Sequence, residues 1–265
     1  MAHIQTDRRE FVKYSTLGIL GLVLGGGMVF SPYAVASENR LRPPGAVDEK
    51  RFLALCIKCG QCLQVCPYHS IKLADFNKGH GAGTPYIDAS ERGCYACEAV
   101  PCVLACPSGA LDHHCEKAAD IHMGIAVLQF PDTCLALSNT PIPAGYNKKM
   151  HSFTNSVTNI HEYETKLLEK LDTFEAKQCT LCADMCPIAN PLSAIAMVSD
   201  SGGGNRPEIY EGCIGCGVCQ EVCPTNTPSI VVKPRMTYET YYSQMLHTQT
   251  NSSVLVAGTK VPTTP

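Results

Sequence analysis

The residues in this sequence best suited to chemistry are its cysteines, which number 17 among 265 residues. Two runs share the spacing C-x2-C-x2-C-x3-C followed by proline. They consist of Cys56, Cys59, Cys62 and Cys66, and of Cys213, Cys216, Cys219 and Cys223. This spacing holds 4Fe-4S clusters in bacterial ferredoxins, because closely spaced thiolates on one loop can wrap a cubane of iron and sulfide. Each run is therefore predicted to bind such a cluster.

Two further groups of cysteines depart from that spacing. One has two extra residues between its second and third members and consists of Cys94, Cys97, Cys102 and Cys106. The other supplies only three thiols, with alanine at the place of the first, and consists of Cys179, Cys182 and Cys186. Spacing alone leaves Cys115 and Cys134 unassigned.

Other uses of cysteine fit this pattern less well. Structural zinc takes two separated pairs and has no use for a third cysteine or for the closing C-x3-C-P. Covalent haem requires a histidine directly after a C-x2-C pair, and no pair here is followed by one. A disulfide scaffold is permissible outside the cytoplasm, but an odd cysteine count leaves at least one thiol unpaired.

Composition narrows the class of protein. A formal net charge of −3 offers no general surface for phosphate, which argues against DNA or RNA as a partner. The content of 45% hydrophobic and 17% charged residues is that of a folded protein. Aromatic residues are only 7% and Trp is absent, so an ordinary aromatic core would be thin. Bound clusters are expected to organise most of the fold.

Residues 1–36 have the three-part pattern of an export signal. A charged start containing Arg8 and Arg9 leads into a mostly apolar run from Tyr14 to Phe30, and a small-residue site follows at Ala34-Val35-Ala36. The paired arginines resemble the twin-arginine motif of the pathway that exports folded proteins. A single membrane anchor or an ordinary secretory signal is the alternative, but the run is short and rich in glycine.

The elements that must position the cysteines are short. Proline after the last cysteine suits the first turn of a helix, so we predict helices beginning at Pro67 and Pro224, each opened by the fourth cysteine. Short β-rich runs follow, at residues 70–73 and 229–232. The fold class predicted is α+β, with ferredoxin-like two-cluster modules.

From these motifs the chain resembles the NapG/MauM family of periplasmic ferredoxin-type proteins, which are associated with nitrate reductase and methylamine dehydrogenase systems. The resemblance extends to about Arg235 and includes Gly83-Thr84-Pro85-Tyr86 and the stretch from Met123 to Leu128. It implies that Cys134, followed by Leu135, completes the third motif with Cys179, Cys182 and Cys186. Four 4Fe-4S clusters then account for every cysteine except Cys115.

The insert, residues 137–178, separates Cys134 from Cys179 and is longer than the resemblance leads us to expect. One amphipathic helix is predicted over about residues 159–177, because apolar residues recur at helical spacing and charged residues, Glu164 among them, lie between them. The apolar positions are Ile160, Tyr163, Leu167, Leu171 and Phe174. Its expected role is to pack over the cluster domain, and partner docking is the alternative.

The four motifs are expected to pair as nested modules within residues 37–235. The outer module would combine motifs 56–66 and 213–223, which share one spacing, and the inner module would combine motifs 94–106 and 134–186. Since each motif gives its fourth cysteine to the partner cluster, nesting groups Cys66 with Cys213 and Cys223 with Cys56. Pairing of sequential neighbours is the alternative. Residues 236–265 form a tail, with three tyrosines that suit docking.

Four clusters predict an electron carrier and not an enzyme, since no local motif for a substrate site is present. The resemblance implies a periplasmic protein, soluble or peripherally bound to the membrane, and two kinds of partner. One is an integral-membrane, quinol-oxidising ferredoxin-type protein (NapH-like), and the other is a periplasmic reductase or cytochrome, such as nitrate reductase. The alternative is a fixed electron-transfer subunit of a larger molybdoenzyme or dehydrogenase complex.

Overall fold

The computed structural model describes residues 39–75, 81–188, 193–200 and 202–245. The chain divides into two units, Met1–Glu38 with Ala74–Gly83, and Asn39–Leu73 with Thr84–Pro265. Every helix and strand given below belongs to the second unit. The predicted export signal, residues 1–36, lies outside the described residues.

Four helices of four residues each follow one plan. They are α3 (Gln61–Gln64), α4 (Pro101–Leu104), α7 (Leu181–Asp184) and α8 (Val218–Glu221). Each carries the third cysteine of its motif and ends before the fourth. The predicted helices at Pro67 and Pro224 are therefore wrong. After Cys66 the chain turns back at once, with His69 at φ 52°, to reach the next strand.

In the part of the chain that the structure describes, six strands form three antiparallel pairs. Their bounds are β1 (Ile71–Leu73), β2 (Pro85–Ile87), β3 (Gly124–Leu128), β4 (Ile195–Ser199), β5 (Asn205–Ile209) and β6 (Ile230–Pro234). The pairs are β1 with β2, β3 with β6 and β4 with β5. The predicted strands at residues 70–73 and 229–232 are confirmed as β1 and β6. The mixed content of helix and strand confirms the α+β class.

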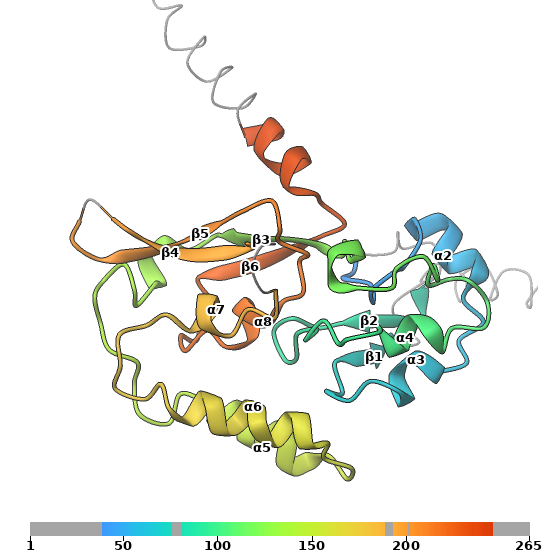
Figure 1. Ribbon diagram of the computed structural model, residues 1–265, viewed down its shortest axis with the longest axis horizontal. Coiled ribbons are helices and arrows are strands. Elements are labelled where there is room, and N and C mark those ends of the chain that lie inside the picture. Colours follow the sequence, from blue (N-terminus) through green and yellow to red (C-terminus); the bar gives the residue numbers. More distant parts are fainter. Residues whose placement is uncertain (1–38, 76–80, 189–192, 201, 246–265) are drawn as a thin grey trace, which may run out of the picture. The chain divides into compact units, whose positions relative to one another are not determined.

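The elements form two groups that follow the sequence (Figure 1). Helices α3 and α4 contact each other beside β1 and β2, preceded by α2 (Glu49–Leu55), whose Phe52 is fully buried. Helices α7 and α8 contact each other beside β4 and β6. Each group thus contains two successive cysteine motifs.

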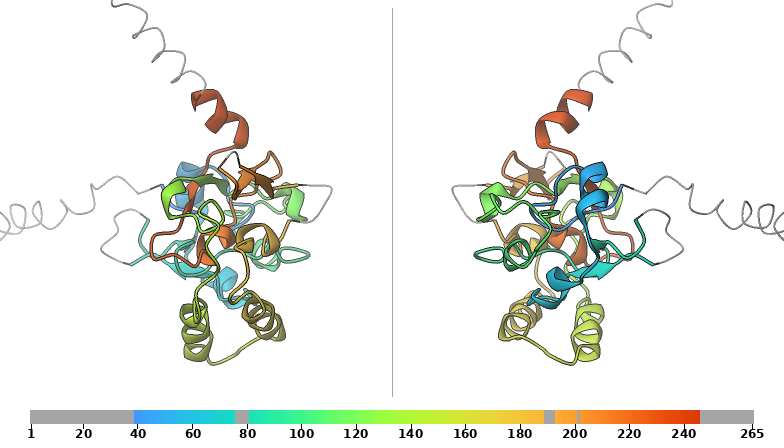
Figure 2. Two further views of the ribbon diagram at one scale, coloured as in Figure 1. Left: turned by 90° about the vertical axis from the view of Figure 1, so that its left-hand side faces the viewer. Right: turned by 90° about the vertical axis from the view of Figure 1, so that its right-hand side faces the viewer.

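The insert forms two helices, not one. Helix α5 (Lys148–Ser156) was not predicted, and α6 (Glu162–Asp172) is shorter than the predicted helix over residues 159–177. The chain leaves helical geometry at Val157 and starts again at His161, whose side chain accepts a hydrogen bond from the N–H of Tyr163. The two helices lie side by side below the strands (Figure 2).

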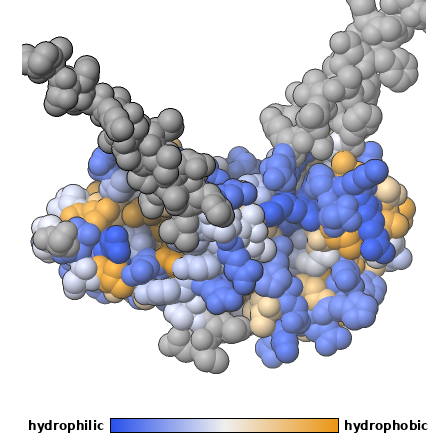
Figure 3. Space-filling view, turned by 90° about the horizontal axis from the view of Figure 1, so that it is seen from above, coloured by the Kyte–Doolittle hydropathy of each residue, from blue (hydrophilic) through white to orange (hydrophobic). Residues whose placement is uncertain are grey.

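The described part of the tail, residues 236–245, contains helical residues from 238 onward. Among the described residues, none of the helices combines the length and the apolar character needed to cross a membrane. On the face shown in Figure 3, hydrophilic side chains predominate, and apolar ones form separate patches.

Candidate iron-sulfur sites

All cysteines except Cys115 gather into four groups of four thiols, three from one motif and one from another. Site I consists of Cys56, Cys59, Cys62 and Cys106. Site II consists of Cys94, Cys97, Cys102 and Cys66. Site III consists of Cys134, Cys179, Cys182 and Cys223. Site IV consists of Cys213, Cys216, Cys219 and Cys186.

The positions of the fourth cysteines show that the predicted nested pairing is wrong. Cys66 lines the cavity of site II, and Cys106 lies by the thiols of site I, so motifs one and two exchange their fourth members. Cys223 and Cys186 do the same between motifs three and four. The sequential alternative therefore holds. Short connections explain it, because each motif pairs with the one that follows it in the same group of elements.

Cys134 lies where the family resemblance implied. It lines the cavity of site III together with Cys179 and Cys182, although 44 residues of sequence separate it from Cys179. A backbone bridge between Pro141 and Gln178 closes the base of the insert and brings the two ends together. The long insert consequently leaves the group of thiols intact.

The thiols of sites II, III and IV line small cavities of about 20 Å³ each. Cysteines and apolar residues dominate their lining, and no carboxylate or imidazole takes part. Within the described residues, no three His, Cys, Asp or Glu are placed to hold a single metal ion. Four thiolates bound to one zinc ion would each lie about 2.3 Å from it. Groups of four thiols that are not placed to hold a single ion suit a cubane instead.

Burial makes the thiolates of these sites dependent on a bound cation. It is the main cause that raises the pKa of Cys62 to about 11 and that of Cys94 to about 12, and neighbouring thiols raise both further. Burial likewise raises the pKa of Cys219 well above its ordinary value. Four buried thiolates would repel one another unless an iron core compensated their charge. None of the 17 cysteines forms a disulfide.

Backbone N–H groups point at the sulfur atoms. The N–H of Ser70 donates to Sγ of Cys66 at 3.3 Å, and that of Ser229 donates to Sγ of Cys223 at 3.4 Å. Ala126 donates in the same way to Cys213 at 3.4 Å. Such contacts stabilise thiolate charge and tune the potential of a bound cluster.

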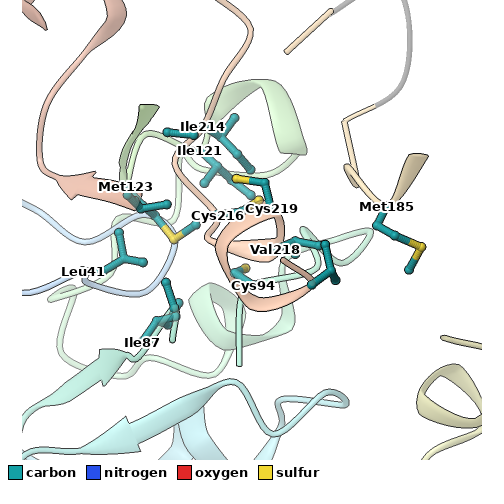
Figure 4. Close-up of a cluster of buried hydrophobic side chains, with 14 of the residues drawn as sticks. Leu41, Ile87, Cys94, Ile121, Met123, Met185, Ile214, Cys216, Val218 and Cys219 are labelled. Carbon is teal, nitrogen blue, oxygen red and sulfur yellow. The ribbon is translucent and has the colours of Figure 1, made fainter. Parts of the chain in front are cut away.

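The two groups of elements meet between sites II and IV. The backbone N–H of Cys94 donates to the carbonyl oxygen of Cys216 at 2.7 Å. Figure 4 shows Cys94 next to the segment that carries Cys216, Val218 and Cys219. A Cβ on Gly93 would lie 2.5 Å from the backbone nitrogen of Val218, so glycine is required for this close approach.

Sequence reasoning missed a buried charged group at this junction. Arg92 contacts Glu164 and Glu221, and all three side chains are at most 1% exposed. The only signal was an arginine two residues before Cys94 and a glutamate two residues after Cys219. Helical spacing assigned Glu164 to the polar face of the insert helix, yet it is fully buried.

Cys115 lies outside the four sites. It is buried, and its thiol accepts a backbone hydrogen bond from Gly45. Burial raises the pKa of Cys115 to about 11, with further contributions from Asp120 and Asp112. The surroundings are those of a packed structural thiol.

Comparison with known families gives two matches. The family model of a 4Fe-4S dicluster domain matches residues 55–110, and that of a 4Fe-4S binding domain matches residues 207–229. The first match spans motifs one and two, in agreement with their pairing in sites I and II. With four groups of four cysteines, the chain has the sites of a protein with four 4Fe-4S clusters.

Known relatives match most of the chain. It is 32% identical over 240 residues to the ferredoxin-type protein NapG of Escherichia coli K12, with 87% of each chain covered. It is 33% identical over 238 residues to the methylamine utilization ferredoxin-type protein MauM of Paracoccus denitrificans, with 87% of this chain and 89% of the relative covered. No solved structure matches the chain significantly. With its cysteine sites and this similarity, the chain belongs to the NapG and MauM family of ferredoxin-type electron-transfer proteins.

Proposed function

We propose that this protein is a periplasmic electron relay in which sites I to IV each hold one 4Fe-4S cluster through their four cysteines. The observation that carries the proposal is that every site has a close neighbour, so that the four form one unbroken series. A 4Fe-4S cluster supplies reversible electron uptake at each site.

Electrostatic interactions between thiols of neighbouring sites support the order I, II, IV, III. The charge of Cys62 in site I acts on Cys102 in site II. The charge of Cys94 in site II acts on Cys216 in site IV. The charge of Cys182 in site III acts on Cys219 in site IV. Sites I and III are therefore the two ends of the proposed path.

Site I is the end that reaches the surface most directly. Cys59 is exposed, whereas the other sites have no exposed ligand. Ile57 and Leu104, which flank site I in the sequence, are 65% and 64% exposed. An exposed ligand with apolar neighbours suits brief contact with a redox partner, because desolvation there is cheap and the distance for electron transfer is short.

The location and the partners of the relay are also proposals. Arg8, Arg9 and the apolar run that follows support export in folded form. Family membership supports a quinol-oxidising ferredoxin-type membrane protein (NapH-like) on one side. On the other side it supports a periplasmic reductase or cytochrome, such as nitrate reductase. The protein itself would transfer electrons without a substrate site of its own.

Iron and acid-labile sulfide analysis with EPR on anaerobically purified protein tests the relay. Four clusters give about sixteen iron atoms per chain, and loss of site III alone gives about twelve. Zinc in place of iron would overturn the proposal. For the location, replacing both Arg8 and Arg9 with lysine should keep the protein in the cytoplasmic fraction, while the unchanged protein appears in the periplasmic fraction.

The mode of action is tested by purification under mild conditions. A mobile relay elutes by itself, and its clusters are reoxidised by added partner at a rate that increases with partner concentration. Elution with a stoichiometric catalytic subunit would instead identify a fixed subunit of a larger complex.

A further inference from the structure

Three charged side chains form a buried group at the junction of the two element groups. Nη2 of Arg92 lies 2.7 Å from Oε1 of Glu164, and Nη1 lies 3.1 Å from Oε1 of Glu221. One guanidinium therefore faces two carboxylates in a region without solvent. The side chain of His69 approaches from the edge, with Nδ1 3.3 Å from Oε2 of Glu164 and about a third of its surface exposed. With a neutral imidazole, the group carries one net negative charge.

This charge lies against sites II and IV. Oε2 of Glu221 accepts hydrogen bonds from the N–H of Gly93 at 2.7 Å and from the hydroxyl of Tyr95 at 3.0 Å. Gly93 and Tyr95 are the two neighbours of the site II ligand Cys94 in the sequence. Glu221 itself is on α8, which carries the site IV ligand Cys219.

Glu164 is the member that the insert supplies. The insert also packs around the same arginine, since the ring of Phe153 from α5 lies 5.1 Å from the guanidinium of Arg92. Tyr163, next to Glu164, stacks on Tyr68 at 6.0 Å between ring centroids, and Tyr68 stacks on Tyr95 at 4.5 Å. Leu167 and Leu171 of α6 are also buried, so apolar contacts contribute to holding the helix in place. A buried carboxylate is costly, so its presence points to an electrostatic role.

We propose that Glu164 is a charge supplied by the insert that lowers the reduction potentials of sites II and IV relative to sites I and III. The proposal rests on the assignment of 4Fe-4S clusters to these sites under the proposed function. Reduction adds one negative charge to a cluster, and a buried carboxylate nearby opposes that addition. Screening is weak because the group is enclosed by protein. The insert therefore raises the energetic barrier that an electron crosses at the two central sites of the path, II and IV.

The test is an EPR-monitored redox titration of the intact protein and of Glu164→Gln. Glutamine keeps the shape and removes the charge. The matched control is Glu162→Gln on the same helix, because Glu162 is exposed and pairs with Lys166 on the surface. A second variant, Glu164→Asp, retains the charge.

Two of the four midpoint potentials should shift to more positive values in Glu164→Gln and stay in place in Glu162→Gln and Glu164→Asp. Four unchanged potentials in Glu164→Gln would overturn the proposal, and so would an equal shift of all four. A shift in Glu164→Asp that matches the glutamine variant would assign Glu164 to packing, as would loss of iron from Glu164→Gln. Iron content and EPR signals of the unchanged protein test the relay itself, so the two failures are distinguishable.

Discussion

The N–H of Cys94 and the carbonyl oxygen of Cys216 form a 2.7 Å hydrogen bond between residues that belong to two different cysteine sites. Because both residues are proposed ligands, this bond fixes the position of site II relative to site IV without an intervening side chain. The backbone itself therefore holds sites II and IV close to each other at this point.

Cys134 and Cys115 provide a matched pair of substitutions. Cys134→Ser should lower the iron content by about four atoms per chain, because Cys134 lines site III and one lost thiolate weakens a four-thiolate site. Cys115→Ser should leave iron content unchanged, since Cys115 lies outside the four sites. Iron analysis and EPR measure both. Equal iron loss in the two variants would show that Cys134 acts only in packing.

Double substitutions distinguish sequential from nested pairing. Cys66→Ser combined with Cys94→Ser removes two ligands of site II, so the double variant should lose about four iron atoms, as either single variant does. Cys66→Ser combined with Cys213→Ser affects sites II and IV and should lose about eight. The reverse result, with the larger loss in the first double variant, would restore the nested arrangement.

Gly93→Ala tests the contact between the two element groups. The added methyl group would lie 2.5 Å from the nitrogen of Val218 and 2.7 Å from the carbonyl carbon of Gly217, so the junction must open. We expect a cost of about 1–3 kcal/mol. The temperature at which the visible absorbance of the clusters bleaches should fall by several degrees. Gly202→Ala is the control, because its nearest atom is 3.4 Å away on a flexible side chain. Identical bleaching temperatures for both variants would contradict the steric argument.

Alkylation of Cys115 in the intact protein should depend steeply on pH. Its pKa is raised to about 11, chiefly by burial, and only the thiolate reacts. Its thiolate fraction, and hence the labelling rate, should therefore increase about tenfold for each pH unit between about pH 7 and 9. Mass spectrometry after treatment with iodoacetamide measures the rate, and Cys115→Ser identifies the peptide. A rate that levels off near about pH 8.5 would indicate an ordinary, unburied thiol.

The cysteines that form the four sites could be predicted from the sequence, but the site to which each fourth cysteine belongs could not. Spacing and family resemblance selected the 16 cysteines other than Cys115 that now gather in four groups. The nested pairing was inferred from equal spacing in the first and fourth motifs. Spacing within a motif carries no information on which other motif contributes the fourth thiol, because that choice depends on how the elements between motifs pack.

The burial of Glu164 in the insert could not be predicted from the sequence either. Helical periodicity correctly indicated buried positions at Leu167 and Leu171. It also placed Tyr163, which is exposed, on the apolar face, and it assigned the buried Glu164 to the solvent face. Its partner, Arg92, is 72 residues away in the sequence. A charge that is buried because of a distant partner leaves no periodic signal in the residues around it.

The base of the insert has a consequence for how this protein can change over evolution. Ile142 and residues 176–177 exchange backbone hydrogen bonds, next to the bridge between Pro141 and Gln178. The loop is closed there before either end reaches site III. Length and sequence beyond this closure can therefore vary without moving the thiols of Cys134 and Cys179. A lineage can exchange one accessory helix pair for another while the metal-binding framework underneath stays constant.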